Sequence, residues 1–444
     1  MRDRNPAISK GVDWSLVWIY FLLVAIGLTA IFAATYKEGD PVIQSFLRFR
    51  TDYSKQFYFF CASLLIALFI LLTDSKFFTA TANLWYAVGI FLLLLVFPFH
   101  SDIKGTKSII KLGAFNFQPA EFCKIVVCLA LAKYLSRPDT DFSRTRSHLI
   151  AAGIALLPAV LAIMQSETGL ALVYFAFFIV MYREGFPSGI LVIGFFIAAL
   201  IVSTLLFEKM TLAIILTALA VLVIYSMRKQ IRRNRSIIIN IALIWGVCVA
   251  IQLYAVPLVF KHVLKLYQVE RIYSTVGKEV PSEYMKAHIT EATVVKKKDT
   301  DYNVRQSKIA IGSGGVLGKG LLKATQTRYD FVPEQRTDFI FCTVGEGFGF
   351  VGSFILLIIY LILLFRIVTV AERQRSVFSR CYAYGVASVF FFHIAINIAM
   401  TVGLAPVIGI PLPFISYGGT SLITFTILLF ILIRLDADRQ MVLR

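Results

Sequence analysis

Long apolar stretches separated by short polar ones make up most of this chain. A helix needs ~20 predominantly apolar residues to cross a bilayer, and about twelve stretches approach that length. The pattern therefore predicts an all-α polytopic membrane protein with about twelve transmembrane helices. The predicted spans lie at about 13–34, 57–73, 79–98, 118–135, 149–164, 168–183, 188–207, 210–227, 237–258, 339–366, 380–403 and 412–434.

The charged residues between the spans predict how the chain is oriented. An even number of spans places both termini on one side, and Lys and Arg gather in the short loops of that side, above all in Arg228–Arg235. The positive-inside rule then predicts cytoplasmic termini. We divide the chain into an N-terminal transmembrane bundle (1–260), a large extracytoplasmic loop (261–338) and C-terminal transmembrane helices (339–444), all in one integral membrane domain.

The composition supports a membrane protein. The chain of 444 residues is 58% hydrophobic and 16% charged, whereas soluble domains are about 25% charged. The net charge of +18 would suggest nucleic acid for a soluble protein. Here the charges lie in loops between apolar spans, so we expect membrane lipids as partners and no nucleic acid. The long polar loop has no cysteine, which argues against a disulfide framework or a zinc site.

The run Pro333–Phe341 leads from the polar loop into an apolar span and places Asp338 at the predicted water–lipid boundary. A carboxylate at that depth is partly desolvated, so it is a functional candidate. Asp is also a favoured N-cap residue, and Asp338 could simply cap the following helix.

The glycine-rich run Gly312–Gly320 suggests a phosphate-binding loop, but it does not match a P-loop. Lys319 is followed by Gly rather than Ser or Thr, and we expect no nucleotide. Two interpretations stay open. The backbone amides could bind a diphosphate, or the glycines could serve loop geometry alone.

Three further polar groups lie at predicted span ends. Glu121 and Lys124 are three residues apart and fit either a structural ion pair or a substrate site. The segment Gln165–Gly169 between two short spans fits either a site or a tight turn. In Gly403–Thr420, prolines and glycines give a stiff, interrupted start to the last span, and its Ser416 and Tyr417 supply hydroxyls at the depth of Asp338.

Within the preceding span, His393 and Asn397 are four residues apart and share one helix face. Polar groups inside a span should face the bundle interior or a cavity.

Five of these runs occur in the order typical of the SEDS family (shape, elongation, division and sporulation), which includes FtsW, RodA and SpoVE, and the chain resembles that family over nearly its whole length. Thr325-Gln326-Thr327 followed by Phe331-Val332-Pro333-Glu334 resembles the RodA branch more than the FtsW branch. The runs are Gln118–Lys124, Gln306–Gly320, Thr325–Thr327, Phe331–Phe341 and Gly403–Ser421.

The resemblance implies a peptidoglycan glycosyltransferase of the bacterial cytoplasmic membrane. Such proteins polymerise lipid II, a disaccharide-peptide on undecaprenyl diphosphate, at the outer membrane face for cell elongation and shape. It also implies a class B penicillin-binding protein as partner and a divalent cation, Mg²⁺ or Mn²⁺. The family core has ten spans, so this chain would carry two more, at about 188–227 or nearby.

The family's essential Asp of a Thr-Asp-Phe motif corresponds to Asp338, which we expect to act as the general base and which could also bind the cation. The chain departs from the family at Arg336, where His is frequent, at Ser108, where Trp is common, and at Glu167, the acidic residue of a replaced Gln-Pro-Asp-Leu-Gly pattern. We expect thirteen substrate-binding residues: Lys111, Gln118, Glu121, Lys124, Glu167, Gln306, Ser313, Thr325, Gln326, Glu334, Arg336, Ser416 and Tyr417.

Two other function classes fit a chain of this composition. A lipid II flippase or other transporter should have ionisable residues near the bilayer midplane and an inverted repeat. The sequence shows no clear repeat, and its acidic candidates lie near the outer span ends, apart from Glu346 a turn or two inside. A non-catalytic cell-wall scaffold should tolerate replacement of the polar loop residues.

Overall fold

The structure is a computed structural model. It describes residues 11–36, 41–47, 51–99, 101–103, 106–112, 115–262 and 300–439, together with Phe49 and single positions from 264 to 285. Residues 286–299 of the predicted extracytoplasmic loop lie outside the described residues.

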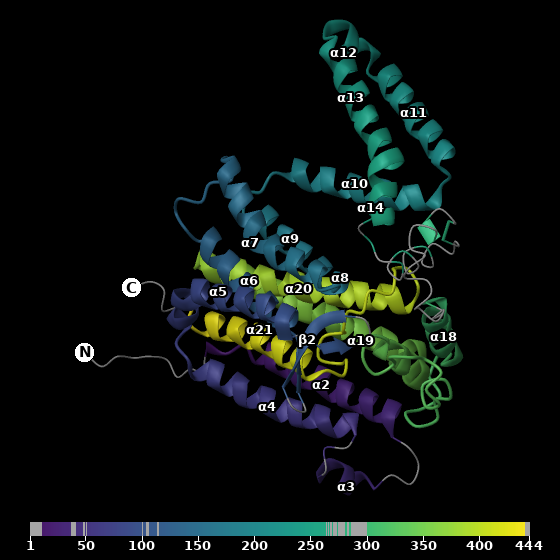
Figure 1. The fold of residues 1–444 in the computed structure, drawn as a ribbon. Helices are drawn as coiled ribbons and strands as arrows, with labels where there is room; N and C mark the ends of the chain where they lie inside the picture. The colour runs from purple at the N-terminus through teal and green to yellow at the C-terminus, as the bar shows by residue number, and fades with distance from the viewer. Residues whose placement is uncertain are drawn as a thin grey trace, which may run out of the picture. The chain divides into compact units, whose positions relative to one another are not determined.

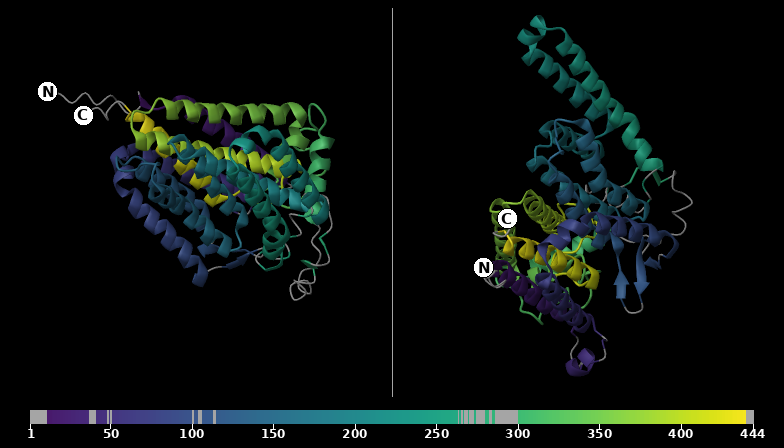
Figure 2. Two further views of the ribbon diagram at one scale, coloured as in Figure 1. Left: turned by 90° about the horizontal axis from the view of Figure 1, so that it is seen from above. Right: turned by 90° about the vertical axis from the view of Figure 1, so that its left-hand side faces the viewer.

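The described helices form two compact units (Figures 1 and 2). Unit 1 comprises the chain up to Phe186 and from Asn303 onward, and unit 2 comprises residues 187–302. These units cut across the three consecutive regions that we predicted (1–260, 261–338 and 339–444), and that division stays a prediction.

Unit 1 is a bundle built mainly from long apolar helices (Figure 1). Its helices are α2 (Trp14–Thr35), α3 (Val42–Leu47), α4 (Asp52–Leu72), α5 (Ser75–Phe99), α6 (Pro119–Leu135), α7 (Thr145–Met164), α8 (Thr168–Val173), η1 (Tyr174–Ala176), α9 (Phe177–Arg183), most of α18 (Thr300–Ser313), α19 (Ile340–Glu372), α20 (Val377–Thr401) and α21 (Gly419–Ala437).

The interior of unit 1 is formed by α6, α20 and α21, which pack on one another. Nearly every residue of α6 from Pro119 to Ala132 is buried, including two charged ones. A helix surrounded by protein need not be apolar on every side, which explains how α6 carries charges inside a membrane bundle.

A small sheet departs from the predicted all-α fold. Strands β1 (Ser101–Ile103), β2 (Thr106–Leu112) and β3 (Phe115–Phe117) form an antiparallel sheet in the order β1-β2-β3. The sheet follows α5 and precedes α6, where the β-branched Thr106, Ile109 and Ile110 favour strand over helix. Its strands are too short to give a clear alternating pattern in the sequence, so the all-α prediction was wrong here.

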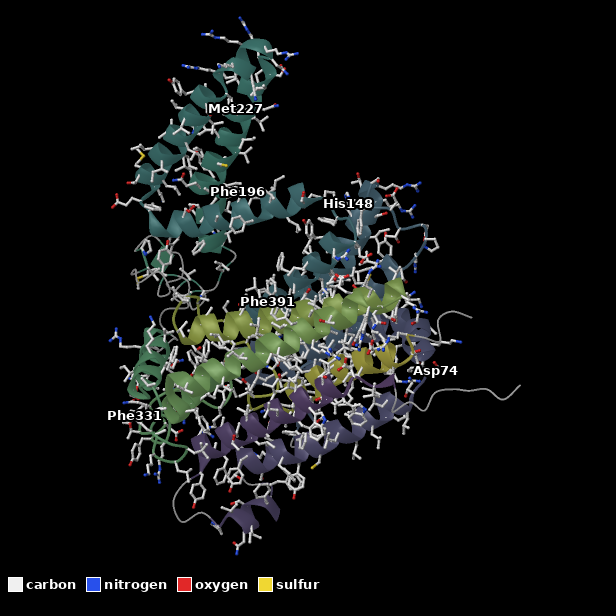
Figure 3. The ribbon with its side chains drawn as sticks, turned by 180° about the vertical axis from the view of Figure 1, so that it is seen from behind. Asp74, His148, Phe196, Met227, Phe331 and Phe391 are labelled. Carbon is white, nitrogen blue, oxygen red and sulfur yellow. The ribbon has the colours of Figure 1, made fainter. Side chains whose placement is uncertain are left out.

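Unit 2 contains α10 (Ser188–Leu206), α11 (Lys209–Ser226), α12 (Arg228–Arg233), α13 (Ser236–Ala250), the π-helix η2 (Ile251–Ala255) and α14 (Val256–His262). Helices α11 and α13 form a hairpin with Met227 near its tip (Figure 3). Trp245 donates a hydrogen bond to Thr217 Oγ1 across this hairpin at 3.2 Å. The apolar faces of both helices are largely exposed in the structure, as expected for helices that face lipid.

Within the described part of the chain, nine helices are long and apolar enough to cross a membrane: α2, α4, α5, α7, α11, α13 to α14, α19, α20 and α21. The three other predicted spans are also helical: α6 and α8 to α9 are shorter, and α10 contains the apolar helical stretch Ser188–Ile197. The chain is therefore a mainly helical integral membrane protein, and the number of spans and the sidedness of the loops stay predictions.

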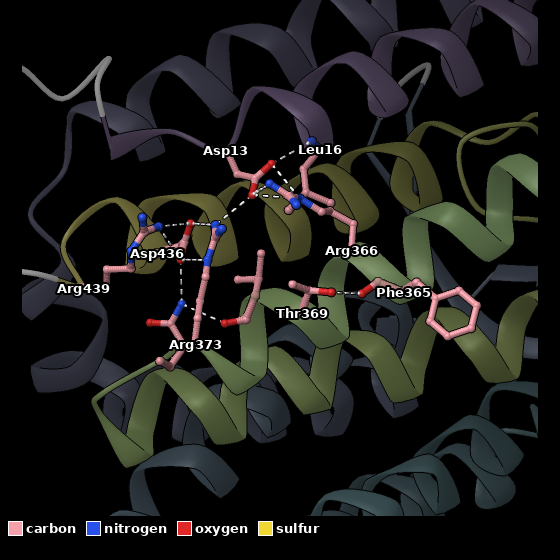
Figure 4. Close-up of polar contacts among 10 residues, drawn as sticks. Asp13, Leu16, Phe365, Arg366, Thr369, Arg373, Asp436 and Arg439 are labelled. Atoms are coloured by element: carbon pink, nitrogen blue, oxygen red, sulfur yellow. Dashed lines mark hydrogen bonds and ion pairs between the residues drawn. The ribbon is translucent and has the colours of Figure 1, made fainter.

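Both ends of the described chain meet at one end of unit 1 (Figure 4). Arg373 bridges Asp13, which caps α2 by accepting from Leu16 N at 3.3 Å, to Asp436 near the end of α21. Arg366 also pairs with Asp13 at 2.8 Å. Phe331, in the loop before α19, lies at the opposite end of unit 1 from Asp74, in the turn between α4 and α5 (Figure 3).

Candidate functional site

Asp338 lies in the last turn before α19 and is partly exposed. The N-cap position of α19 is occupied by Phe339 rather than by Asp338. Its Oδ2 atom lies 3.3 Å from the position that a Cβ atom on Gly409 would occupy. The carboxylate therefore sits against the loop 403–418 that precedes α21.

Three consecutive backbone carbonyls around Asp338 accept hydrogen bonds from residues in the C-terminal part of the chain. The carbonyls of residues 336, 337 and 338 accept, in that order, from Tyr417 N at 2.8 Å, Ser416 Oγ at 2.6 Å and Asn397 Nδ2 at 2.8 Å. Ser416 Oγ also accepts from Leu412 N at 2.8 Å. The Ser416 hydroxyl, predicted to bind substrate, is buried and holds backbone instead.

Arg336 forms an ion pair beside Asp338. Its Nη1 lies 2.6 Å from Asp52 Oδ2 at the start of α4, and its Nη2 lies 3.6 Å from Asp330 Oδ1. The Arg336 side chain stays 41% exposed, so it can still meet a ligand. Burial and the neighbouring Asp52 carboxylate raise the pKa of the Tyr417 hydroxyl to about 12, so this phenol is neutral at physiological pH.

Glu121 and Lys124, both on α6, form a buried ion pair inside the bundle. Lys124 Nζ lies 2.6 Å from Glu121 Oε2 and 2.9 Å from His393 Nε2, and it stands over the Phe425 ring at 4.8 Å. Lys124 is fully buried and Glu121 almost so. The structure thus places both residues, predicted to bind substrate, inside the bundle as the structural pair that was the alternative interpretation.

A second buried carboxylate, Glu346, organises the polar loop. It accepts hydrogen bonds from the backbone amides of residues 325, 326 and 327 at 2.8–2.9 Å, from the Thr325 and Thr327 hydroxyls, and from Lys319 Nζ at 2.9 Å. Ser313 Oγ lies 3.4 Å away. Ser313, Thr325 and Gln326, predicted to bind substrate, therefore gather around Glu346.

The glycine-rich loop forms backbone hydrogen bonds with α19 on both sides of a break in that helix. Gly349 has φ 67° and ψ −160°, which interrupts the helix. The carbonyls of residues 346 and 347 accept instead from the amides of residues 319 and 320, at 3.1 and 2.9 Å. The amides of residues 350 and 351 donate to the carbonyls of residues 315 and 316, at 2.9 and 3.0 Å.

This pairing needs glycine on both sides of the contact. A Cβ on Gly314 or Gly318 would lie 2.1 or 2.2 Å from a carbonyl oxygen of the helix, and one on Gly349 would lie 2.3 Å from Gly318 N. The backbone amides of this loop thus serve the helix. Of the two interpretations of Gly312–Gly320, loop geometry is the one that the structure favours.

The segment Gln165–Gly169 contacts both strand β2 and the loop 403–418 beside Asp338. Ser108 donates to Glu167 Oε1 at 2.5 Å, and Gln118 donates to the same atom at 3.2 Å. A Cβ on Gly169 would lie 2.5 Å from the carbonyl oxygen of Ile408, next to Gly409. This segment is a tight turn that also touches the loop beside Asp338.

The remaining predicted site residues are more scattered. Glu334 accepts from the Thr337 hydroxyl at 3.1 Å, Lys111 is exposed on β2 opposite Asn116, and Gln306 is half-buried on α18. The site around Asp338 thus combines Arg336, Ser416 and Tyr417 with residues that the sequence did not assign to it. Those residues are Asp52, Asn397 and Gly409.

The family model for FtsW, RodA and SpoVE, described as a cell cycle protein, matches residues 13–237 and 188–441. The two matches overlap at 188–237, where we predicted additional helices. Among relatives, the peptidoglycan glycosyltransferase RodA of Treponema pallidum is 30% identical over 435 residues, covering 96% of this chain and 97% of the relative. The peptidoglycan glycosyltransferase MrdB of Escherichia coli is 29% identical over 356 residues, covering 80% of this chain and 78% of the relative.

Solved structures share the fold. The RodA structure from Thermus thermophilus aligns with a TM-score of 0.60 at 23% identity, covering 96% of this chain and 97% of that one. A chain from a peptidoglycan synthase complex aligns with a TM-score of 0.65 at 24% identity, covering 96% and 98%. Because the family model and the Treponema relative both extend over most of its length, the chain belongs to the FtsW/RodA/SpoVE family.

Proposed function

We propose that this protein is a peptidoglycan glycosyltransferase that polymerises lipid II into glycan strands for cell elongation and shape. Full-length relatives are named as peptidoglycan glycosyltransferases. The observation that carries the proposal is the Asp338 carboxylate, which is partly exposed on a backbone fixed at three consecutive carbonyls. A rigidly held carboxylate suits a general base, because proton abstraction requires it within hydrogen-bond reach of the substrate.

Asp338 takes the proton from the 4-hydroxyl of the acceptor sugar as that oxygen attacks the anomeric carbon of the donor. A new bond joins the acceptor oxygen to this carbon while the bond to the lipid diphosphate breaks, so the configuration inverts. The proton ends on Asp338, and the diphosphate leaves as an anion.

The leaving diphosphate needs positive charge nearby. Arg336 is the best-placed side chain, because it is half-exposed and two residues from Asp338. Lys111 is exposed on β2. Lys124 is enclosed with Glu121 and His393, so we assign it no contact with the substrate.

A divalent cation would add charge stabilisation at the diphosphate. Within the described residues no three acidic, His or Cys side chains cluster as a metal site. Mg²⁺ often takes one or two protein carboxylates and completes its shell with water and substrate phosphates. Asp338 fits such a single-carboxylate ligand, so Mg²⁺ or Mn²⁺ is part of the proposal.

We further place the reaction at the outer face of the bacterial cytoplasmic membrane, with a class B penicillin-binding protein as partner for crosslinking. Phe331, in the loop that leads to Asp338, lies at the opposite end of unit 1 from Asp74 (Figure 3). The end of α21 lies beside Asp74, because Arg434 donates to the carbonyl of Thr73 at 2.6 Å. This separation agrees with cytoplasmic termini and an extracytoplasmic site.

The test is polymerisation of purified lipid II by the wild type and by Asp338→Asn in detergent with Mg²⁺. We expect Asp338→Asn to lose polymerisation while Asp139→Asn, an exposed loop change, keeps it. An unchanged rate for Asp338→Asn would refute the base. Translocation of lipid II across vesicles without polymer formation would instead favour the flippase function.

A further inference from the structure

We propose that Asn397 and His393 are positioning residues for Asp338, acting through the carbonyls of residues 338, 410 and 411. The inference rests on the proposed function, because it assumes that the geometry of Asp338 sets the rate. Neither residue touches the predicted reacting atoms. Both hold backbone that the carboxylate depends on.

Asn397 uses both amide hydrogens to join two segments. Its Nδ2 atom donates to the carbonyl of Asp338 at 2.8 Å and to the carbonyl of Ile410 at 2.7 Å. Asn397 is fully buried, so water does not compete for these bonds. The opposite amide orientation would place Oδ1 against two carbonyl oxygens, and this fixes the assignment.

His393 holds the next carbonyl of the same loop. Its Nδ1 lies 3.1 Å from the carbonyl oxygen of Pro411, which can only accept, so Nδ1 carries the proton. Its Nε2 lies 2.9 Å from the Lys124 ammonium, which can only donate, so Nε2 accepts. The buried Glu121–Lys124 pair thereby selects the tautomer of His393 that binds the loop.

These bonds matter because the loop lies against the carboxylate. Asp338 Oδ2 is 3.3 Å from the Cβ position of Gly409, and residues 410 and 411 follow directly. One turn of α20 thus fixes both the peptide of Asp338 and the loop that Asp338 touches. A displacement of ~1 Å at a reacting group can cost about a hundredfold in rate.

A purely structural role is the rival explanation, since buried polar groups in any membrane bundle need partners. The two roles differ in what they change. A structural role lowers the melting temperature and the active fraction. A positioning role lowers kcat per folded molecule and leaves KM for lipid II unchanged.

The experiment measures kcat and KM for lipid II polymerisation together with melting temperature, using full-length protein in detergent. Asn397→Ala removes both donors. His393→Asn keeps a donor near the Nδ1 position, whereas His393→Gln keeps a partner for Lys124 near the Nε2 position. Ser388→Ala is the matched control, because this buried residue of α20 bonds only within its own helix, to Tyr384 O.

We expect Asn397→Ala to lower kcat about 10- to 100-fold with KM within about twofold, and Ser388→Ala to behave as wild type. His393→Asn should retain more kcat than His393→Gln. If Asn397→Ala does not fold, the comparison of His393→Asn with His393→Gln tests the inference. Unchanged kcat in folded Asn397→Ala, or a His393→Gln at least as active as His393→Asn, would overturn the inference. If Asp338→Asn stays active, the proposed base fails; if only Asn397→Ala stays active, the base stands and the positioning role fails.

Discussion

Asp338 Oδ2 lies 3.3 Å from the place where a Cβ atom on Gly409 would stand, so a side chain at position 409 would crowd the carboxylate. Gly409 also has φ +79°, a conformation that costs other residues about 1–2 kcal/mol.

We therefore expect Gly409→Ala to reduce polymerisation about tenfold or more, since both strain and crowding displace Asp338. The matched change is Gly153→Ala in α7, where a Cβ meets nothing within 4 Å. It should leave the rate unchanged and stabilise the helix by about 1 kcal/mol. Equal rates for the two variants would show that the contact at Gly409 has no role in catalysis.

Replacing Glu346 should lower the stability of the folded protein. Glu346→Gln places an amide group among backbone donors at 2.8–2.9 Å and removes the charge that Lys319 faces. Leaving buried donors unsatisfied costs about 1–3 kcal/mol, so thermal unfolding should begin several degrees lower. Glu372→Gln, which breaks an exposed pair with Arg183, should hardly change the melting temperature. If the two variants melt alike, Glu346 does not anchor the loop.

Replacing Arg336 should weaken the affinity for the substrate. If the half-exposed Arg336 side chain meets the diphosphate, Arg336→Ala should raise KM about tenfold, equivalent to about 1.4 kcal/mol of lost binding, with a smaller change in kcat. Lys323→Ala, an exposed cation in the preceding loop, should leave KM as it is. A fall in kcat at constant KM would instead indicate that the Asp52 pair serves to position the chain.

The ion pairs of Asp13 should make the stability of the protein fall in acid. Burial alone would raise the pKa of this carboxyl, but hydrogen bonds from Arg366 and Arg373 outweigh burial and hold the pKa below its usual value near 3.8. A lowered folded pKa stabilises the protein above the unfolded pKa, and this contribution is lost as pH falls through the folded value. The melting temperature should therefore drop below about pH 4, and less so in Asp13→Asn. A parallel acid dependence in both proteins would exclude this network as its source.

Hydropathy alone predicted where the long apolar helices lie, because each predicted span overlaps a helical segment. It did not predict the shorter polar helices α12 and α18. It could not predict the β1–β3 sheet, whose strands depend on pairing with one another rather than on their own pattern. The glycine-rich loop was also ambiguous in sequence, because its partner is a break in a helix that begins some twenty residues later.

The candidate site was predictable only where a charge stood out against apolar sequence. Asp338 and Glu346 gave that signal. Asp52 did not, since its partner Arg336 is 284 positions away. Asn397 stood out as a polar residue in a span, but its bond to the Asp338 carbonyl is a tertiary contact that no local pattern encodes. Ser416 and Lys124 were assigned to the substrate because the sequence does not reveal which way a side chain faces.

The four backbone bonds between residues 315–320 and the break in α19 also restrict motion. Straightening the helix at Gly349 would break these four hydrogen bonds, each worth about 0.5–1.5 kcal/mol. The glycine-rich loop therefore holds the two halves of α19 in their bent arrangement.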